Sequence, residues 1–256
     1  MKKKPQRRSS FGGGGSGGYV LTFWGGYTTV SMADINKDFA DQKKEMEEEI
    51  DEANDYGYAI TGTASVTEMG SGFMLGGDIG YYVNYDTLLA LRIGYLSSSS
   101  GELSTQVKYY GTTYTGRTTV DASLVPILFG GSYSHSLGKA TSLLVKAFFG
   151  YGFASSEIEY FSSESNSSGT DTSTLKVPFS GGCAVTDLET GLQFDASNNV
   201  SFELNLGYRS AIVSKMKADK EIKDSDGDVV VKKGETLNYE FDFSGLILAG
   251  GIKFRF

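Results

Sequence analysis

The chain has 256 residues, with 34 Gly, 16 Phe, 16 Tyr and 3 Pro, and 39% of its residues are hydrophobic. A soluble domain of this length would ordinarily hold more Leu, Ile and Val, and no apolar run is long enough for a transmembrane helix. The formal net charge is −8 although the first ten residues include five cations, so the body of the chain repels nucleic acid.

Residues 1–18 are basic and then Gly-rich. The start MKKKPQRRSS resembles the charged beginning of a secretory signal, but FGGGGSGG follows where such a signal would be apolar. The Gly run also lacks the Gly-Lys-Ser/Thr ending of a phosphate-binding loop. We expect a disordered arm over 1–18, with the native signal missing or replaced, and one domain over 19–256.

From Tyr19 onward, segments of about ten residues alternate in polarity, and a period of two is typical of β-strands. Eight segments begin near Tyr19, Gly72, Leu88, Thr118, Leu143, Gly181, Val200 and Leu246. Short turns follow the second, fourth and sixth segments, whereas long polar connections span 31–71, 98–117, 160–175 and 215–238. This plan predicts an all-β fold: an eight-stranded antiparallel up-and-down transmembrane β-barrel, with its turns in the periplasm and its loops outside.

Each segment has one bulky face and one face of small or charged residues. In the seventh, Phe202, Leu204 and Leu206 alternate with Glu203 and Asn205. In a soluble β-sandwich the bulky face would point inward, but then the many glycines would lie on a water-exposed face that has no need of small residues. A narrow barrel interior does need them. The pattern therefore favours bulky residues facing lipid.

The last segment ends in Ile252-Lys253-Phe254-Arg255-Phe256, which alternates apolar residues with cations up to a terminal aromatic. With the eight segments and their spacing, this ending resembles the small bacterial outer-membrane β-barrel family that includes the OmpA transmembrane domain, OmpX and the OmpW-like proteins. The resemblance covers residues 19–256. It implies a location in the bacterial outer membrane, among lipid and lipopolysaccharide, and a barrel-insertion signal at Ile252, Phe254 and Phe256 that is read by the insertion machinery.

Charged residues on the small face are predicted to lie inside the barrel. They are Asp78, Asp187, Glu189 and Glu203 against Arg92, Lys146, Arg209, Lys253 and Arg255. A turn centred on Tyr85 sets Asp78 opposite Arg92, and a turn centred on Asn198 sets Asp187 opposite Arg209. Since an unpaired buried ion is costly, we expect an ion-pair network in a lumen that eight strands leave just wide enough for side chains, although some charges would instead line small water pockets.

The first long connection contains a predicted helix over about 31–55. Met32, Ile35, Phe39, Met46, Ile50 and Ala53 recur at helical spacing, and Ser31 is the expected N-cap. Ten acids and three lysines make the segment strongly negative. It is expected to rest its apolar stripe on the barrel mouth; a lid, a docking surface or a cation-bridged contact with lipopolysaccharide are the functional alternatives.

In the fourth long connection, Asp224, Asp226 and Asp228 suggest a calcium loop, but Gly227 is misplaced for one and no acid follows at the twelfth position. The sequence Asp226-Gly227 favours a hairpin that extends the last two strands above the membrane. We therefore expect no metal and no cofactor.

Catalysis is not predicted. The single Cys183 allows no intrachain disulfide, and the one histidine, His135, lies in a predicted periplasmic turn without an acid nearby. Two functions are consistent with the sequence. The first is a closed structural, adhesive or surface-interaction barrel that presents long outer loops to a ligand. The second is a small-solute channel or hydrophobic-ligand conduit of porin or OmpW-like type, entered past Tyr239, Phe241 and Phe243.

Overall fold

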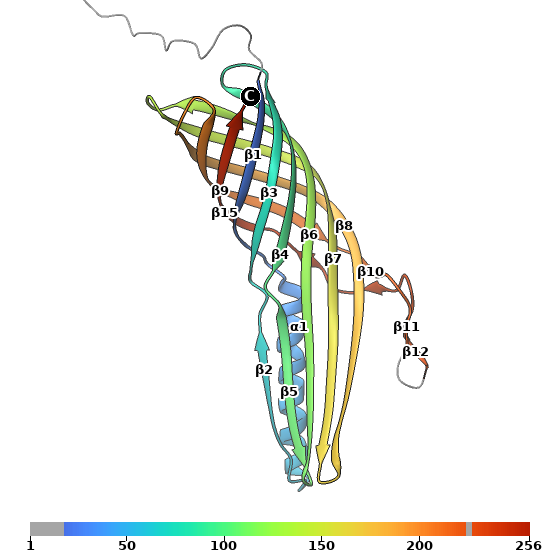
Figure 1. Ribbon diagram of the computed structural model, residues 1–256. Coiled ribbons are helices and arrows are strands. Elements are labelled where there is room, and N and C mark those ends of the chain that lie inside the picture. Colours follow the sequence, from blue (N-terminus) through green and yellow to red (C-terminus); the bar gives the residue numbers. More distant parts are fainter. Residues whose placement is uncertain (1–17, 224–226) are drawn as a thin grey trace, which may run out of the picture.

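The computed structural model describes residues 18–223 and 227–256, and within them eight antiparallel strands form a closed ring (Figure 1). The strands are β1 (Tyr19–Thr29), β3 (Ser71–Tyr82), β4 (Thr87–Ser98), β6 (Thr112–Ser136), β7 (Thr141–Asn166), β8 (Gly169–Asp195), β9 (Val200–Val213) and β15 (Gly245–Arg255). Each pairs with the next, and β1 pairs with β15 to close the ring. The predicted eight-stranded up-and-down barrel is confirmed; most of the predicted arm, residues 1–17, lies outside the described residues.

The short turns set the register of the hairpins. The Asn84 side-chain oxygen accepts hydrogen bonds from the amides of Asp86 and Thr87, at 2.9 and 2.8 Å, which fixes the β3–β4 turn. Ile79 consequently lies opposite Leu91, as the turn centred on Tyr85 predicts. Ser197 plays the same part between β8 and β9, where it accepts from the amides at 199 and 200.

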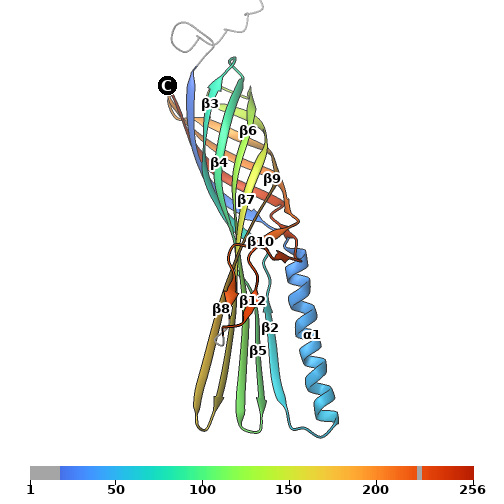
Figure 2. The same ribbon diagram turned by 90° about the vertical axis from the view of Figure 1, so that its right-hand side faces the viewer.

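Two of the predicted long loops are in fact strands. The first of these ranges, 98–117, holds β5 (Gly101–Tyr109) and the start of β6, and the second, 160–175, continues β7 and β8 far beyond the barrel. Together with β2 (Thr61–Thr67) they form one open sheet. We call the outer blade the sheet formed by β2, β5 and residues 112–120, 157–166 and 169–178 (Figure 2). At about 3.3 Å per residue, blade segments of nine or ten residues extend roughly 30 Å past the barrel.

Helix α1 (Ala33–Asp55) confirms the predicted helix, but not its position as a cover over the barrel mouth. It begins at the mouth and runs along β2 and β5 to the far end of the blade (Figure 2). Met32, Ile35 and Phe39 are buried near the mouth, whereas Met46, Ile50 and Ala53 are half-buried against the blade. Gly62 of β2 makes room for Ile50, because a Cβ there would lie 2.4 Å from its Cδ1.

The predicted N-cap at Ser31 is wrong. The capping residue is Met32, in a left-handed conformation with φ 43° and without a side-chain hydrogen bond to the helix. The amides of Ser31 and Met32 instead donate to the carbonyl oxygen of Asp242, at 3.1 and 3.3 Å. The start of the helix is therefore fixed by the last loop of the barrel and not by its own side chains.

The fourth connection contains β10 (Met216–Ala218), β11 (Ile222–Lys223), β12 (Val229–Val231), β13 (Thr236–Leu237) and β14 (Phe241–Asp242). A hairpin forms as predicted, but β11 and β12 make a separate two-stranded sheet and do not extend β9 and β15. The reason is that β10 turns aside to pair with β8 at the base of the blade. Asp224 and Asp226 lie outside the described residues.

Candidate functional site

The lumen contains two bidentate ion pairs, each joining neighbouring strands. Arg92 of β4 donates from Nε and Nη2 to the two carboxylate oxygens of Asp78 on β3, at 2.9 and 3.1 Å. Arg209 of β9 binds Asp187 of β8 in the same way, at 2.7 and 2.8 Å. All four side chains are buried. The two pairs are in the positions that the hairpin registers dictate, because Asp78 is the Cα partner of Arg92 and Asp187 that of Arg209.

Arg92 links the two pairs across the barrel. Its Nη1 donates to Glu189 and lies 3.6 Å from Oδ2 of Asp187. The guanidinium also lies over two rings, 5.1 Å from the centroid of Trp24 and 3.9 Å from that of Phe148. Trp24 Nε1 in turn donates to Asp78 Oδ1 at 2.8 Å. One cation is thus held by three carboxylates and two aromatic faces, which compensates for its removal from water.

A second cluster lies nearer the short turns, which define the turn end of the barrel. There Glu203 binds both Lys146 and Lys253, and Lys253 Nζ also donates to Gln193 Oε1 at 3.0 Å. These groups are buried as well. Arg255 lies apart from the cluster, half-buried at the rim, where its Nη2 lies 2.9 Å from Asp195 Oδ1. Asp195 is a partner that the sequence analysis did not single out.

Toward the blade, the lumen is filled by an apolar plug that the sequence analysis missed. Its fully buried members are Leu96, Leu124, Leu128, Phe241 and Phe243, which continue into Phe148 and Val185. Phe241 and Phe243, which the sequence suggests as part of the entrance to a conduit, are both completely buried. The sequence could have revealed the plug, because counting alternate residues along β6 and β7 places Leu128 and Phe148 on the inward face of their strands.

Above the plug, polar contacts join α1 to the last loop and to the connection between β2 and β3. Tyr239 donates its hydroxyl to Asp38 Oδ2 at 2.9 Å, and Asn36 exchanges two hydrogen bonds with the backbone of Met69. Partial burial and the Asp38 carboxylate together raise the pKa of Tyr239 to about 12. The helix is therefore anchored at the mouth from both sides.

The outer surface of the ring carries a continuous belt of large apolar side chains. Ile79, Ile93 and Leu204 are 63%, 50% and 53% exposed, although each lies within its strand and not at an end. Aromatic residues border the belt at both ends. Tyr19, Tyr81, Tyr133 and Phe194 lie toward the turn end, and Tyr27, Tyr95, Tyr151 and Tyr208 toward the blade.

The terminal residues predicted as an insertion signal face outward in the same belt. Ile252 is exposed, Phe254 packs edge-on against Phe23 at a centroid distance of 6.4 Å, and Phe256 is 78% exposed. The same strand turns Lys253 into the lumen. The alternation of apolar residues and cations at the end of the chain thus separates the lipid-facing side of β15 from its ionic side.

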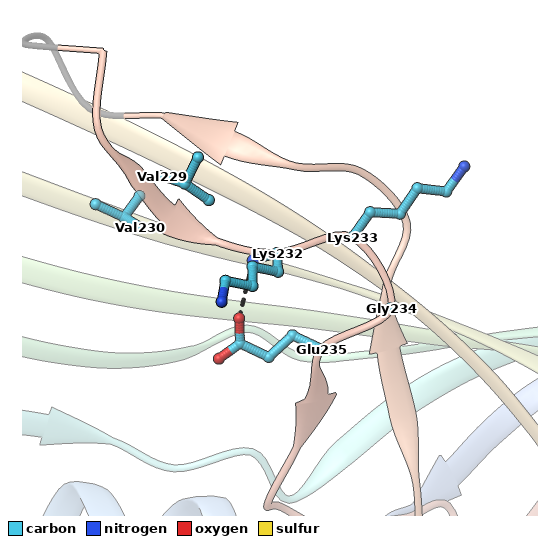
Figure 3. Close-up of a pocket in the computed structure, with 6 residues that line it drawn as sticks. All are labelled: Val229, Val230, Lys232, Lys233, Gly234 and Glu235. Atoms are coloured by element: carbon cyan, nitrogen blue, oxygen red, sulfur yellow. Dashed lines mark hydrogen bonds between the residues drawn. The ribbon is translucent and has the colours of Figure 1, made fainter.

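The described residues offer little else that suggests a catalytic, metal-binding or ligand-binding site. His135 is exposed at the turn end, and residues 18–223 and 227–256 contain no group of three His, Cys, Asp or Glu arranged to hold a metal ion. A hollow of about 590 Å³ is lined by Val229, Val230, Lys232, Lys233, Gly234 and Glu235 (Figure 3). All six come from one hairpin arm, in which the Lys232 amide donates to Glu235 at 2.8 Å, so the hollow follows the shape of a turn. Within the described ranges, no helix has the length and apolarity needed to span a membrane.

No protein-family model matches the chain, and no curated protein matches it. Among solved structures, the outer membrane protein OprG from Pseudomonas aeruginosa is 10% identical, with coverage of 93% of this chain and 95% of its own and a TM-score of 0.41. Neisserial surface protein A is 14% identical over 93% and 97%, with a TM-score of 0.35. The outer membrane protease OmpT from Escherichia coli is 8% identical over 94% and 96%, with a TM-score of 0.29. The barrel fold of this chain is established by its own strand pairing.

Proposed function

We propose that the chain is an integral protein of a bacterial outer membrane whose lumen is closed and whose function is carried by the surface-exposed blade. The belt of exposed apolar residues between two aromatic borders supports the membrane assignment, because a closed ring of strands can satisfy its backbone hydrogen bonds in hydrocarbon. The turn end would then face the periplasm. The blade and α1 would stand outside the cell.

The filled lumen is the observation that carries the closed-barrel proposal. Solutes would have to pass the cluster of Arg92, Glu189 and Asp187 and then the plug capped by Phe241 and Phe243. Opening such a path would require separating buried ions and moving fully packed rings, both of which are energetically unfavourable. The role proposed for the blade is therefore in structure, adhesion or surface interaction, and not in catalysis.

Three partners belong to this proposal. Membrane lipid would contact the belt, and the barrel-insertion machinery would read Ile252, Phe254 and Phe256. Lipopolysaccharide would meet the base of the blade and the acidic face of α1, where its phosphates and the helix carboxylates would share divalent cations. A surface ligand would contact the outer part of the blade.

Planar-bilayer recording of the purified full chain tests the proposal. We expect no steady current from the natural chain, and a conductance from the variant Phe241→Gly/Phe243→Gly/Arg92→Ser, which removes the two rings that cap the plug and the central cation together. The variant shows that silence of the natural chain is not a failure of insertion. A steady single-channel current from the natural chain would overturn the closed lumen and support the small-solute channel.

A further inference from the structure

Three chain segments meet at the far end of the blade, which we call the tip: residues 55–60 after α1, the β5–β6 turn at 109–112 and the β7–β8 turn at 166–169. The rings of Tyr58 and Tyr109 lie 6.4 Å apart and those of Tyr109 and Tyr110 lie 4.3 Å apart. Thr113 pairs with Ser165, so the third turn adjoins the second. Figures 1 and 2 both place these segments together at the end farthest from the barrel.

The tip exposes aromatic side chains far from the belt that faces lipid. Tyr56 and Tyr110 are 76% and 79% exposed, and Tyr58 is 49% exposed. The third turn adds Asn166, Ser167, Ser168 and Gly169. Tyrosines surrounded by Ser, Gly and Asn are the composition of protein-binding loops, because tyrosine supplies a large rigid contact with little loss of side-chain freedom.

The backbone at Tyr110 provides independent support. Tyr110 has φ 45° and Gly111 has φ 83°, so both central residues of this two-residue hairpin turn are left-handed. Asn or Gly is favoured at the first of these positions, whereas a bulky residue is strained there. The strained turn holds its tyrosine outward beside Tyr109. An aromatic at the position where the turn disfavours one indicates that the side chain has a use at the surface.

The charge around the tip selects the kind of partner. The second half of α1 exposes Glu48, Glu49, Asp51, Glu52 and Asp55, and its last turn has no basic residue. The helix C-terminus adds the negative end of its dipole. Lys108 is also near the tip, but it precedes Tyr109 on β5 and so projects from the opposite face of the sheet. Tyr56 and Tyr58 therefore directly follow a negatively charged helix end at Asp55.

We propose that the tip binds an arginine-rich segment of a partner protein, with guanidinium groups stacking on Tyr58, Tyr109 and Tyr110 beside the carboxylates of α1. Arginine is favoured because its planar cation stacks on aromatic rings and pairs with carboxylates at the same time. A neutral sugar would gain only the stacking, and an acidic ligand would be repelled. This inference rests on the proposed display of the blade outside the cell, and it adds the location and chemistry of the contact.

The test measures binding of fluorescein-labelled hexa-arginine to the full chain in non-ionic micelles, by anisotropy at about 150 mM salt, where long-range attraction is screened. We expect Tyr58→Asn/Tyr110→Asn to weaken binding about tenfold, since each exposed cation–π contact contributes a few-fold. Glu49→Gln/Glu52→Gln/Asp55→Asn should also weaken it, and hexa-lysine should bind less tightly than hexa-arginine.

Tyr85→Asn is the matched control, because Tyr85 is an 81% exposed tyrosine in a turn at the opposite end of the barrel. Asparagine suits the left-handed position at 110, and the circular dichroism of each variant verifies that it folds. The inference would be overturned if the tip variant and Tyr85→Asn weakened hexa-arginine binding equally. It would also be overturned if only the variant that neutralises the acids weakened binding. So would tyrosine-dependent binding of maltohexaose without binding of hexa-arginine. These results leave the silent lumen untouched, so the two proposals fail separately.

Discussion

At the scale of single residues, Arg92 has the largest number of charged partners in the described part of the lumen. Replacing it by Met leaves Asp78 and Glu189 buried without their cation, so we expect a loss of about 3–5 kcal/mol in the free energy of unfolding. Arg92→Lys keeps the charge but not the bidentate geometry and should lose less. Urea unfolding in lipid vesicles, followed by the fluorescence of Trp24, the single tryptophan, measures both.

Arg117→Met is the control for this prediction. Arg117 lies on the blade with its side chain 44% exposed and 4.0 Å from Glu159, and an exposed pair of this kind contributes less than about 1 kcal/mol. If Arg92→Met destabilises the protein no more than Arg117→Met does, the lumen charges are not a stabilising network and only line water-filled space.

At the scale of elements, the short turns allowed the strand pairing of the ring to be predicted from the sequence. The sequence of the long connections, in contrast, gave no sign that they form the strands of the blade. The turn at Tyr85 fixes the pairing of a whole hairpin, so the position of Asp78 opposite Arg92 follows from counting residues. The blade strands are rich in Ser and Thr on both faces, and a segment such as Gly169–Leu175 has no apolar alternation to separate strand from loop. These segments form strands because they pair with neighbouring strands, and the local sequence pattern does not predict that pairing.

Within the lumen, the sequence predicted the charged residues but not the apolar ones. An inward charge needs a partner, so sequence and register together suffice to find one. The inward Leu128 and Phe148 follow no such rule, because large apolar residues also face lipid and their type alone does not tell the two sides apart. Alternate residues of a strand face the same side, so counting along each strand would have placed Leu128 and Phe148 inside. We expected only small or charged residues on the inward face and therefore overlooked them.

The docking of α1 on the blade gives the element-scale prediction. Phe39 is 3% exposed, and its ring lies 3.4 Å from where a Cβ on Gly101 would stand, so Phe39→Ala should cost about 3–5 kcal/mol of local stability. Hydrogen exchange should accelerate over residues 33–55 while the ring strands stay protected. Asp41→Ala, on the exposed side of the same helix, should leave exchange unchanged; equal exchange in the two variants would show that the helix is held elsewhere.

At the scale of the whole molecule, the same alternation that fills the lumen makes the outside of the ring apolar, so the membrane assignment can be tested at one outward position. Leu204 lies between the outward-facing Phe202 and Tyr208 of β9, is 53% exposed and is opposite Leu192. Arginine at a bilayer midplane costs about 2–4 kcal/mol, so Leu204→Arg should destabilise the barrel by that amount in lipid vesicles. Thr172→Arg places the same side chain on the blade, in water, and should cost little. If Leu204→Arg and Thr172→Arg change the free energy of unfolding equally, the belt does not lie in hydrocarbon. The apolar surface of the ring would then have to be covered by protein instead.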